Sequence, residues 1–437
     1  MVYLIGFLIP LYDLSFKVFI QFSWYKLIPF ILVLLIIFSR KKVLLPQKRI
    51  FSLVLILMVY FLFVTLVNYI LNSQSGAFNE AIEAGQTYLR VHTHMFVQFI
   101  MICASICQIW LFPYFIKSKY DVDTFVRGFI DGNMISVVAC GFQYALFKYG
   151  LYATDIVTSG YIRISGLGGE PKQFGAFLLL AVFIILANNV SNKPIAIKNS
   201  TLKCAIFIVG IFLCLSLSVW MGLIFGLLTI ALLTLDWRKA ALVILAILSI
   251  WSLLMFNEYF KQMVDLKVVQ RNKSIEQFMA YAPMDALALL LIKNNLAIAF
   301  FGAGAGGDAC RVANLTFLDS VPEPIRKAGI IQRFYNGTAR SSFSPGSFLI
   351  KYIVEYGLVG FALLLITVWH ITKKIRKTRY CRFIVLMTVC VLVANVVSTM
   401  FTYVYFSLLG VLYGYYYNQA RQAKIPIDRF NSEVEQH

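Results

Sequence analysis

The sequence predicts an all-α polytopic membrane protein with about twelve transmembrane helices and one large external loop. Of its 437 residues, 60% are hydrophobic and only 14% are charged, and the mean hydropathy is +0.78. A soluble domain is ordinarily about half apolar and a quarter charged. The apolar runs continue for about 20 residues, the length of a helix that crosses a bilayer, without the alternation of barrel strands. This composition excludes a soluble enzyme, a disordered or fibrous protein and a membrane β-barrel.

The apolar runs define the expected helices in order. Residues 1–12 are expected to form a short or half-inserted helix. The predicted spans are residues 18–38, 51–71, 93–116, 124–149, 172–188, 203–216, 218–235, 240–256, 347–369, 382–399 and 401–417. Because the apolar stretch 203–235 is too long for one helix, we expect a tight hairpin at Ser216-Leu217-Ser218.

These spans predict three regions. An N-terminal bundle, 1–256, includes a short external segment at 151–171; a large external loop follows at 257–346, and C-terminal helices with a cytoplasmic tail complete the chain at 347–437. The 39 Lys and Arg outnumber the 20 Asp and Glu, giving a net charge of +19. Most cations of the short loops fall on one side of this map, which the positive-inside rule identifies as the cytoplasm, together with both termini. The charge is therefore a topology signal, and we expect no nucleic-acid partner.

Metal and nucleotide chemistry lack the necessary residues. Among the eight cysteines only Cys310 falls in an external segment, so no disulfide framework is expected. The four histidines form no ligand cluster with carboxylates, and the sequence contains no P-loop, Rossmann fingerprint or HExxH motif. We therefore expect neither a metal nor a cofactor.

The large external loop contains its own pattern. An amphipathic helix is predicted over Met284–Phe301, followed by a run rich in glycine over residues 302–307. Loops this long escape the positive-inside rule, so their basic residues need another explanation. A solvated, salt-bridged surface explains most of them. The alternative is an anionic ligand, because the planar fork of Arg grips phosphate well.

The shorter external segment has a similar character. Arg163 and Glu170 flank a run of glycines that includes Gly168 and Gly169, just before a predicted helix. Glycine backbone lets N–H groups approach an anion closely, and a helix N-terminus also favours negative charge. The alternative is an ordinary glycine turn that leads into a helix with Pro171 at its first position.

Three motifs resemble those of the bacterial O-antigen polymerase (Wzy) and O-antigen ligase families. The segment Arg163–Gly175 is similar to a family segment in which Arg precedes a turn of small residues and an acidic-Pro-polar triplet opens a helix. Phe301–Gly304 looks like the Gly-x-Gly element of their large external loop, and Glu355–Gly360 resembles the Glu-x-Gly-Leu-x-Gly that follows it. The order of spans and the dominant loop agree with this resemblance, which implies a GT-C-like fold.

Two departures from the family pattern bear on the choice between polymerase and ligase. Ligases place a His-Asn pair, which contains the proposed base, where this sequence has Gly346 and Ser347, and the large loop contains no histidine. The Ser-Arg common after the mid-chain hairpin is Ser218-Val219 here, so one expected cation is missing. The first departure favours a polymerase.

The resemblance implies an enzyme of the bacterial cytoplasmic (inner) membrane that polymerises undecaprenyl-diphosphate-linked repeat units into a surface polysaccharide. The implied partners are the lipid-linked glycan donor and acceptor, the bilayer and a chain-length regulator protein. It also implies an inverting transfer without metal. Arg side chains would stabilise the leaving diphosphate, and a carboxylate would take the proton of the acceptor hydroxyl.

Candidate residues follow from these motifs and from the loop. The predicted catalytic residues are Arg163, Glu170, Glu323 and Arg340, and the predicted substrate-binding residues are Arg326, Arg333, Gly168 and Gly169. Glu170 and Glu323 are alternatives for the base. For Arg340 the other interpretation is a helix-end side chain that reaches lipid headgroups.

Two charge pairs within predicted spans have a simpler interpretation. Lys351 and Glu355, four residues apart, are expected to form an internal ion pair, and Arg127 with Asp131 a similar pair near the cytoplasmic end. Two other functions remain as alternatives for the chain: an O-antigen ligase or related glycan transferase, and a flippase of lipid-linked oligosaccharides. A flippase should show two similar halves, and no repeat is evident between 1–218 and 219–437.

Overall fold

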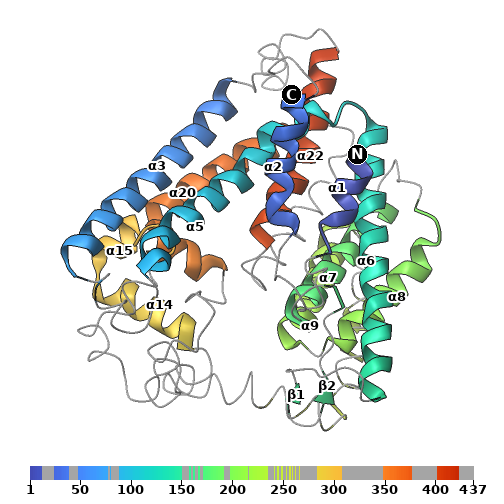
Figure 1. Ribbon diagram of the computed structural model, residues 1–437. Helices are drawn as coiled ribbons and strands as arrows, with labels where there is room; N and C mark the ends of the chain where they lie inside the picture. Colours follow the sequence, from blue (N-terminus) through green and yellow to red (C-terminus); the bar gives the residue numbers. More distant parts are fainter. Residues whose placement is uncertain are drawn as a thin grey trace. The chain divides into compact units, whose positions relative to one another are not determined.

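The computed structural model describes most of the predicted helices. The described residues are 1–11, 24–38, 48–76, 88–149, 157–158, 161–162, 166–167, 171–190, 197–214, 216–234, 283–307, 348–375 and 401–422, with isolated residues at 79 and between 241 and 265. Apart from one pair of two-residue strands, the elements in these ranges are helices (Figure 1). The predicted span 382–399 lies outside the described residues, and so do about half of the residues in 240–256.

Four helices of the described part are long and apolar enough to cross a bilayer. They cover Arg49–Gln74, His92–Tyr114, Lys119–Leu146 and Leu349–Ile375. Large apolar side chains on these helices, such as Phe63, Phe142 and Trp369, are more than 60% exposed. Such exposure is unfavourable in water and normal against lipid. The prediction of a helical membrane protein is confirmed at this level.

One compact unit contains residues Met1–Gln47, Ala104–Ser249 and Ile371–His437. Its helices are α1 (Val2–Leu8), α2 (Trp24–Phe38), the end of α5 (Tyr88–Leu111), α6 (Lys119–Lys148), α7 (Pro171–Val190), α8 (Ser200–Leu213), α9 (Leu217–Thr234) and α22 (Phe401–Gln422). The short helix α1 lies directly against α6 (Figure 1). A Cβ on Gly128 would lie 2.2 Å from the carbonyl oxygen of Tyr3, and one on Gly132 equally close to that of Phe7. Small residues four apart thus let the two backbones touch.

The helix boundaries in this unit follow the sequence signals. The helix α7 begins at Pro171, as its position after an acidic residue predicts. The long apolar stretch is interrupted as expected, between Leu213 and Leu217, but the break comes earlier than predicted, because Leu217 and Ser218 already belong to α9. The indole Nε1–H of Trp220 donates to the carbonyl oxygen of Ile211 at 3.0 Å, which fastens the start of α9 to the end of α8.

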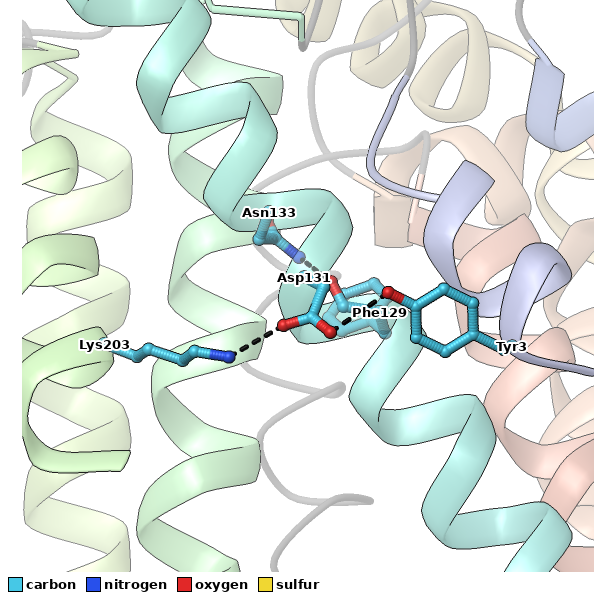
Figure 2. A network of polar contacts seen from close by, with 5 residues as sticks. All are labelled: Tyr3, Phe129, Asp131, Asn133 and Lys203. Atoms are coloured by element: carbon cyan, nitrogen blue, oxygen red, sulfur yellow. Dashed lines mark hydrogen bonds and ion pairs between the residues drawn. The ribbon is translucent and has the colours of Figure 1, made fainter. Parts of the chain in front are cut away.

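An ion pair connects three helices of the same unit (Figure 2). The Asp131 carboxylate of α6 accepts from Lys203 Nζ of α8 at 2.7 Å and from the Tyr3 hydroxyl of α1 at 3.1 Å. Two residues further along α6, Asn133 Nδ2 donates to the carbonyl oxygen of Phe129. The pair is formed with α8 rather than with the expected Arg127, because the packing of α8 on α6 brings a lysine closer than the next turn of α6 does.

The other compact unit contains Lys48–Cys103 and Ile250–His370. Its helices are α3 (Lys48–Gln74), the start of α5, α14 (Pro283–Asn294), α15 (Leu296–Phe301) and most of α20 (Phe348–Ile375). In Figure 1, α15 lies at one end of α3. The expectation of a single helix over Met284–Phe301 is wrong, because Asn295 is extended (φ −139°, ψ 100°) and its side chain accepts from the Ile298 N–H at 3.2 Å. Asparagine is a strong N-cap, so it begins a new helix here.

Candidate functional site

The residues predicted from the sequence as catalytic or substrate-binding all lie outside the described residues. They are Arg163, Gly168, Gly169, Glu170, Glu323, Arg326, Arg333 and Arg340. Their roles stay predictions. The described part nevertheless shows how parts of the three motifs are held.

The motif that begins at Arg163 is fixed on both sides of that residue. Before it, the two-residue strands β1 (Val157–Thr158) and β2 (Tyr161–Ile162) pair in antiparallel register. After it, the carbonyl oxygen of Gly166 accepts from Gln143 Nε2 at 2.8 Å, and the N–H of the next residue donates to a serine hydroxyl of α6 at 3.0 Å. The first motif is therefore fastened to α6.

The other two motifs meet each other. Residues 302–307, here called the glycine turn, pack against the middle of α20. The N–H groups of Ala303 and Gly304 donate to the carbonyl oxygens of Val354 and Glu355, both at 2.8 Å. These carbonyls can accept because α20 is interrupted at Gly357, where φ is 69° and ψ is 178°.

Two glycines make this contact possible. A Cβ on Gly302, which has φ +88°, would lie 2.3 Å from the carbonyl oxygen of Glu355. A Cβ on Gly357, with φ +69°, would lie 2.2 Å from that of Phe300. In both cases the obstacle is backbone, which cannot rotate away. The glycines of the two motifs thus allow the backbone of the glycine turn and the backbone of α20 to approach each other closely.

Side chains of α3 and α20 take up further N–H groups of the glycine turn. The Ala305 N–H donates to Thr65 Oγ1 at 3.2 Å, and that hydroxyl donates to the carbonyl oxygen of Phe61 at 2.7 Å. The Gly306 N–H donates to Glu355 Oε1 at 3.2 Å. A carboxylate from α20 and a hydroxyl from α3 therefore hold the same turn.

The remaining N–H groups of the turn are also satisfied within the protein. Gly302 donates to the carbonyl oxygen of Ile298 at 2.9 Å, and Gly307 to that of Gly304 at 3.0 Å. The carbonyl oxygen of Gly302 accepts from Asn68 Nδ2 of α3. Since every N–H of the turn has a protein acceptor, its backbone works as a docking element and leaves no open cradle for an anion.

Charged side chains lie beside this turn. Lys351 Nζ is 3.9 Å from Glu355 Oε1, so the ion pair expected from their spacing is confirmed. The Glu355 side chain is 7% exposed and that of Lys351 24%. From α5, the His94 ring lies against Gly306, where a Cβ would be 2.8 Å from Nε2. We call these three side chains, Thr65 and the glycine turn the glycine-turn site. Among the described residues no group of three His, Cys, Asp or Glu could hold a metal ion.

A groove runs between α3 and α15 next to this site. Its volume is about 540 Å³. It is lined by Tyr60, Phe63, Val64, Val67, Asn68, Leu71, Ser75, Asn295, Ala297, Ile298, Phe301 and Gly302. The hydroxyl of Tyr60 and the amide N–H groups of Asn68 already donate to backbone carbonyls. The wall is therefore apolar in effect.

The α3 residues of the site were missed from the sequence alone. Thr65, Asn68 and Asn72 are buried, and they recur at positions 0, 3 and 7 of one helix face. Polar residues at helical spacing within an apolar run are a signal for a site inside a membrane bundle. This signal was present in the sequence, although it does not name the partner.

We find no protein-family model and no curated protein that matches this chain. The functional interpretation rests on the three motifs and on the geometry of the site.

Proposed function

We propose that this protein is a glycosyltransferase that polymerises undecaprenyl-diphosphate-linked repeat units into a surface polysaccharide, such as O-antigen or capsule. The contact between the glycine turn and the Glu355–Gly360 motif carries the proposal. The two motifs, about 50 residues apart in the chain, were singled out by one family resemblance, and they pack on each other through their glycines. Elements of one site are expected to meet in this way.

The reaction requires a charge clamp and a base. The acceptor hydroxyl oxygen attacks the anomeric carbon of the donor, the bond from that carbon to the diphosphate oxygen breaks, and the diphosphate leaves with the electron pair. Arg163, Arg326, Arg333 and Arg340 are the proposed clamp, since guanidinium groups stabilise the charge that develops on the leaving diphosphate. A carboxylate, for which Glu170 and Glu323 are the alternatives, takes the proton.

The proposed setting is the bacterial inner membrane. About twelve helices in a GT-C-like arrangement would place both termini in the cytoplasm and residues 257–346 and 151–171 outside. The groove between α3 and α15 supports a substrate carried on lipid. Most of its lining is apolar, and the polar groups of Tyr60 and Asn68 bond to backbone carbonyls, so it suits hydrocarbon better than sugar.

The test is the polymer pattern of cells that lack the native gene. Arg163→Ala should abolish the polymer ladder at normal protein abundance, because a diphosphate clamp contributes several kcal/mol at the transition state, at about 1.4 kcal/mol per tenfold in rate. Arg163→Lys should also be impaired, because a point charge does not replace the bidentate fork. The control is Lys148→Ala, which removes an exposed cation at the end of α6 and should leave the ladder intact. A normal ladder from Arg163→Ala would remove this residue from the active site.

Topology gives an independent test. Single cysteines at positions 340 and 377, in a background without other cysteines, should react with an impermeant reagent from opposite sides of the membrane. Labelling from the same side would overturn the proposed orientation and the mechanism that depends on it.

A further inference from the structure

We propose that Lys351 is an anion-binding residue at the start of α20, held in place by Glu355, and that it contacts the diphosphate of the lipid-linked substrate. The identity of this ligand rests on the proposed function. The anion site itself rests on the geometry of the glycine-turn site.

The ion pair leaves the lysine donors unused. At 3.9 Å, the distance from Lys351 Nζ to Glu355 Oε1 exceeds hydrogen-bond length, so the attraction is coulombic only. Among the described residues no other acceptor contacts this ammonium group. Within the described part of the chain its three N–H donors are therefore unused, and they can serve an anionic ligand.

The carboxylate has a different role from that of the lysine. Glu355 Oε1 accepts from the Gly306 N–H, and its backbone carbonyl oxygen accepts from Gly304, so both ends of the residue are held by the glycine turn. With its side chain only 7% exposed, Glu355 is poorly placed to meet a ligand. It is a positioning residue that keeps the cation beside the turn.

The location of Lys351 favours an anion. Its side chain is three times as exposed as that of Glu355, and it lies in the first turn of α20, where the helix dipole favours negative charge. A lysine oriented by a glutamate for contact with phosphates is the arrangement that protein kinases use. Charged residues within candidate membrane spans are costly, which is a reason to expect a functional role for this pair.

The test separates a structural pair from a functional one. A single variant would leave one charge of the pair uncompensated, whereas Lys351→Met with Glu355→Gln removes both charges and keeps an acceptor oxygen for the Gly306 N–H. We expect this double variant to match the wild type in abundance and melting temperature. Its affinity for inorganic diphosphate, measured by calorimetry in phosphatidylcholine nanodiscs, should fall by about tenfold or more, the loss of one charge-assisted contact.

The matched control is Lys203→Met with Asp131→Asn, the neutral form of the other described pair. It should bind diphosphate as the wild type does. The proposal is overturned if the Lys351→Met, Glu355→Gln protein keeps the wild-type affinity, if the wild type does not bind diphosphate, or if both double variants lose affinity equally.

The same variants distinguish this inference from the proposed function. Binding that depends on Lys351 in a protein that makes no polymer would leave the anion site standing and reject the polymerase. A normal polymer ladder from the Lys351→Met, Glu355→Gln variant would reject the assignment of the site to the substrate, while the polymerase would stand.

Discussion

In the described part of the chain, the ion pairs Asp131–Lys203 and Lys351–Glu355 are built differently. Asp131 and Lys203 join separate helices at 2.7 Å, with a tyrosine hydroxyl on the other carboxylate oxygen. Lys351 and Glu355 belong to one helix, are 3.9 Å apart, and the carboxylate holds a backbone N–H of the glycine turn. In the first pair a charge-assisted hydrogen bond connects two helices.

The two lysines differ in whether the paired carboxylate accepts a hydrogen bond from the ammonium group. Lys203 uses a donor on Asp131 within hydrogen-bond reach, as a side chain that fastens α8 to α6 should. Lys351 remains close to its carboxylate without bonding to it. A pair that only stabilises the fold gains most from short contact, so the looser pair is the better candidate for function.

The largest expected effect breaks the glycine-turn site directly. Gly302→Ala places a Cβ 2.3 Å from a backbone oxygen at φ +88°, so it should destabilise the protein by about 3 kcal/mol or more. The matched control is Gly76→Ala, where φ is +75° but no atom lies within 4 Å of the added Cβ. It should cost about 1 kcal/mol. Thermal unfolding in detergent measures the stability of both variants. Equal losses of stability would contradict the close backbone contact at Gly302.

A smaller effect tests the polar contact from α3. Thr65→Val keeps the shape of the side chain but leaves the buried Ala305 N–H without its acceptor, at a cost of about 2 kcal/mol. Thr65→Ser retains the hydroxyl and should lose much less stability. If valine and serine variants melted at the same temperature, the hydroxyl would not hold the turn.

The start of α15 provides a still smaller effect. Asn295→Ala removes the side-chain acceptor of the Ile298 N–H and should cost about 1 kcal/mol. Asn295→Ser preserves a cap, and Asn294→Ala alters an exposed neighbour outside the cap position. The melting temperature should fall for Asn295→Ala alone. An equal fall for Asn294→Ala would mean that the cap is not the cause.

The smallest effect is expected at the Asp131–Lys203 pair, to which we assign a structural role. Asp131→Asn with Lys203→Met should destabilise the protein by no more than about 1 kcal/mol, since it removes both charges of the pair together and leaves neither unpaired. Polymer should be made normally, as measured by the ladder at matched abundance. Loss of polymer at normal abundance would place this pair in the active machinery and remove the contrast between the two pairs.

Local signals in the sequence predicted much of the helical fold. The apolar runs predicted the described spans, Pro171 marked the start of α7, and the length of the run 203–235 required the break before α9. The break at Asn295 was missed because apolar residues continue on both sides of it. There the capping preference of asparagine outweighs the periodic pattern.

Contacts between distant segments were not predictable in the same way. The partner of Asp131 comes from another helix, and the glycine turn meets α20 through backbone carbonyls that only the kink at Gly357 makes available. Neither contact follows from the spacing of residues within one helix. The motifs nevertheless identified both sides of the second contact, because each motif contains a glycine, Gly302 or Gly357, where an added Cβ would collide with the other backbone.

The most direct measurement of the proposed function is chain extension by the purified protein. Sealed proteoliposomes that contain the wild type and lipid-linked repeat units should accumulate a ladder of longer glycans on the carrier lipid, with release of undecaprenyl diphosphate and without added nucleotide. Arg163→Ala protein at the same concentration should give no ladder. Glycan transfer to a lipid A core with no polymer on the carrier lipid would identify a ligase instead, and movement of lipid-linked glycan across the bilayer without extension would contradict the transferase altogether.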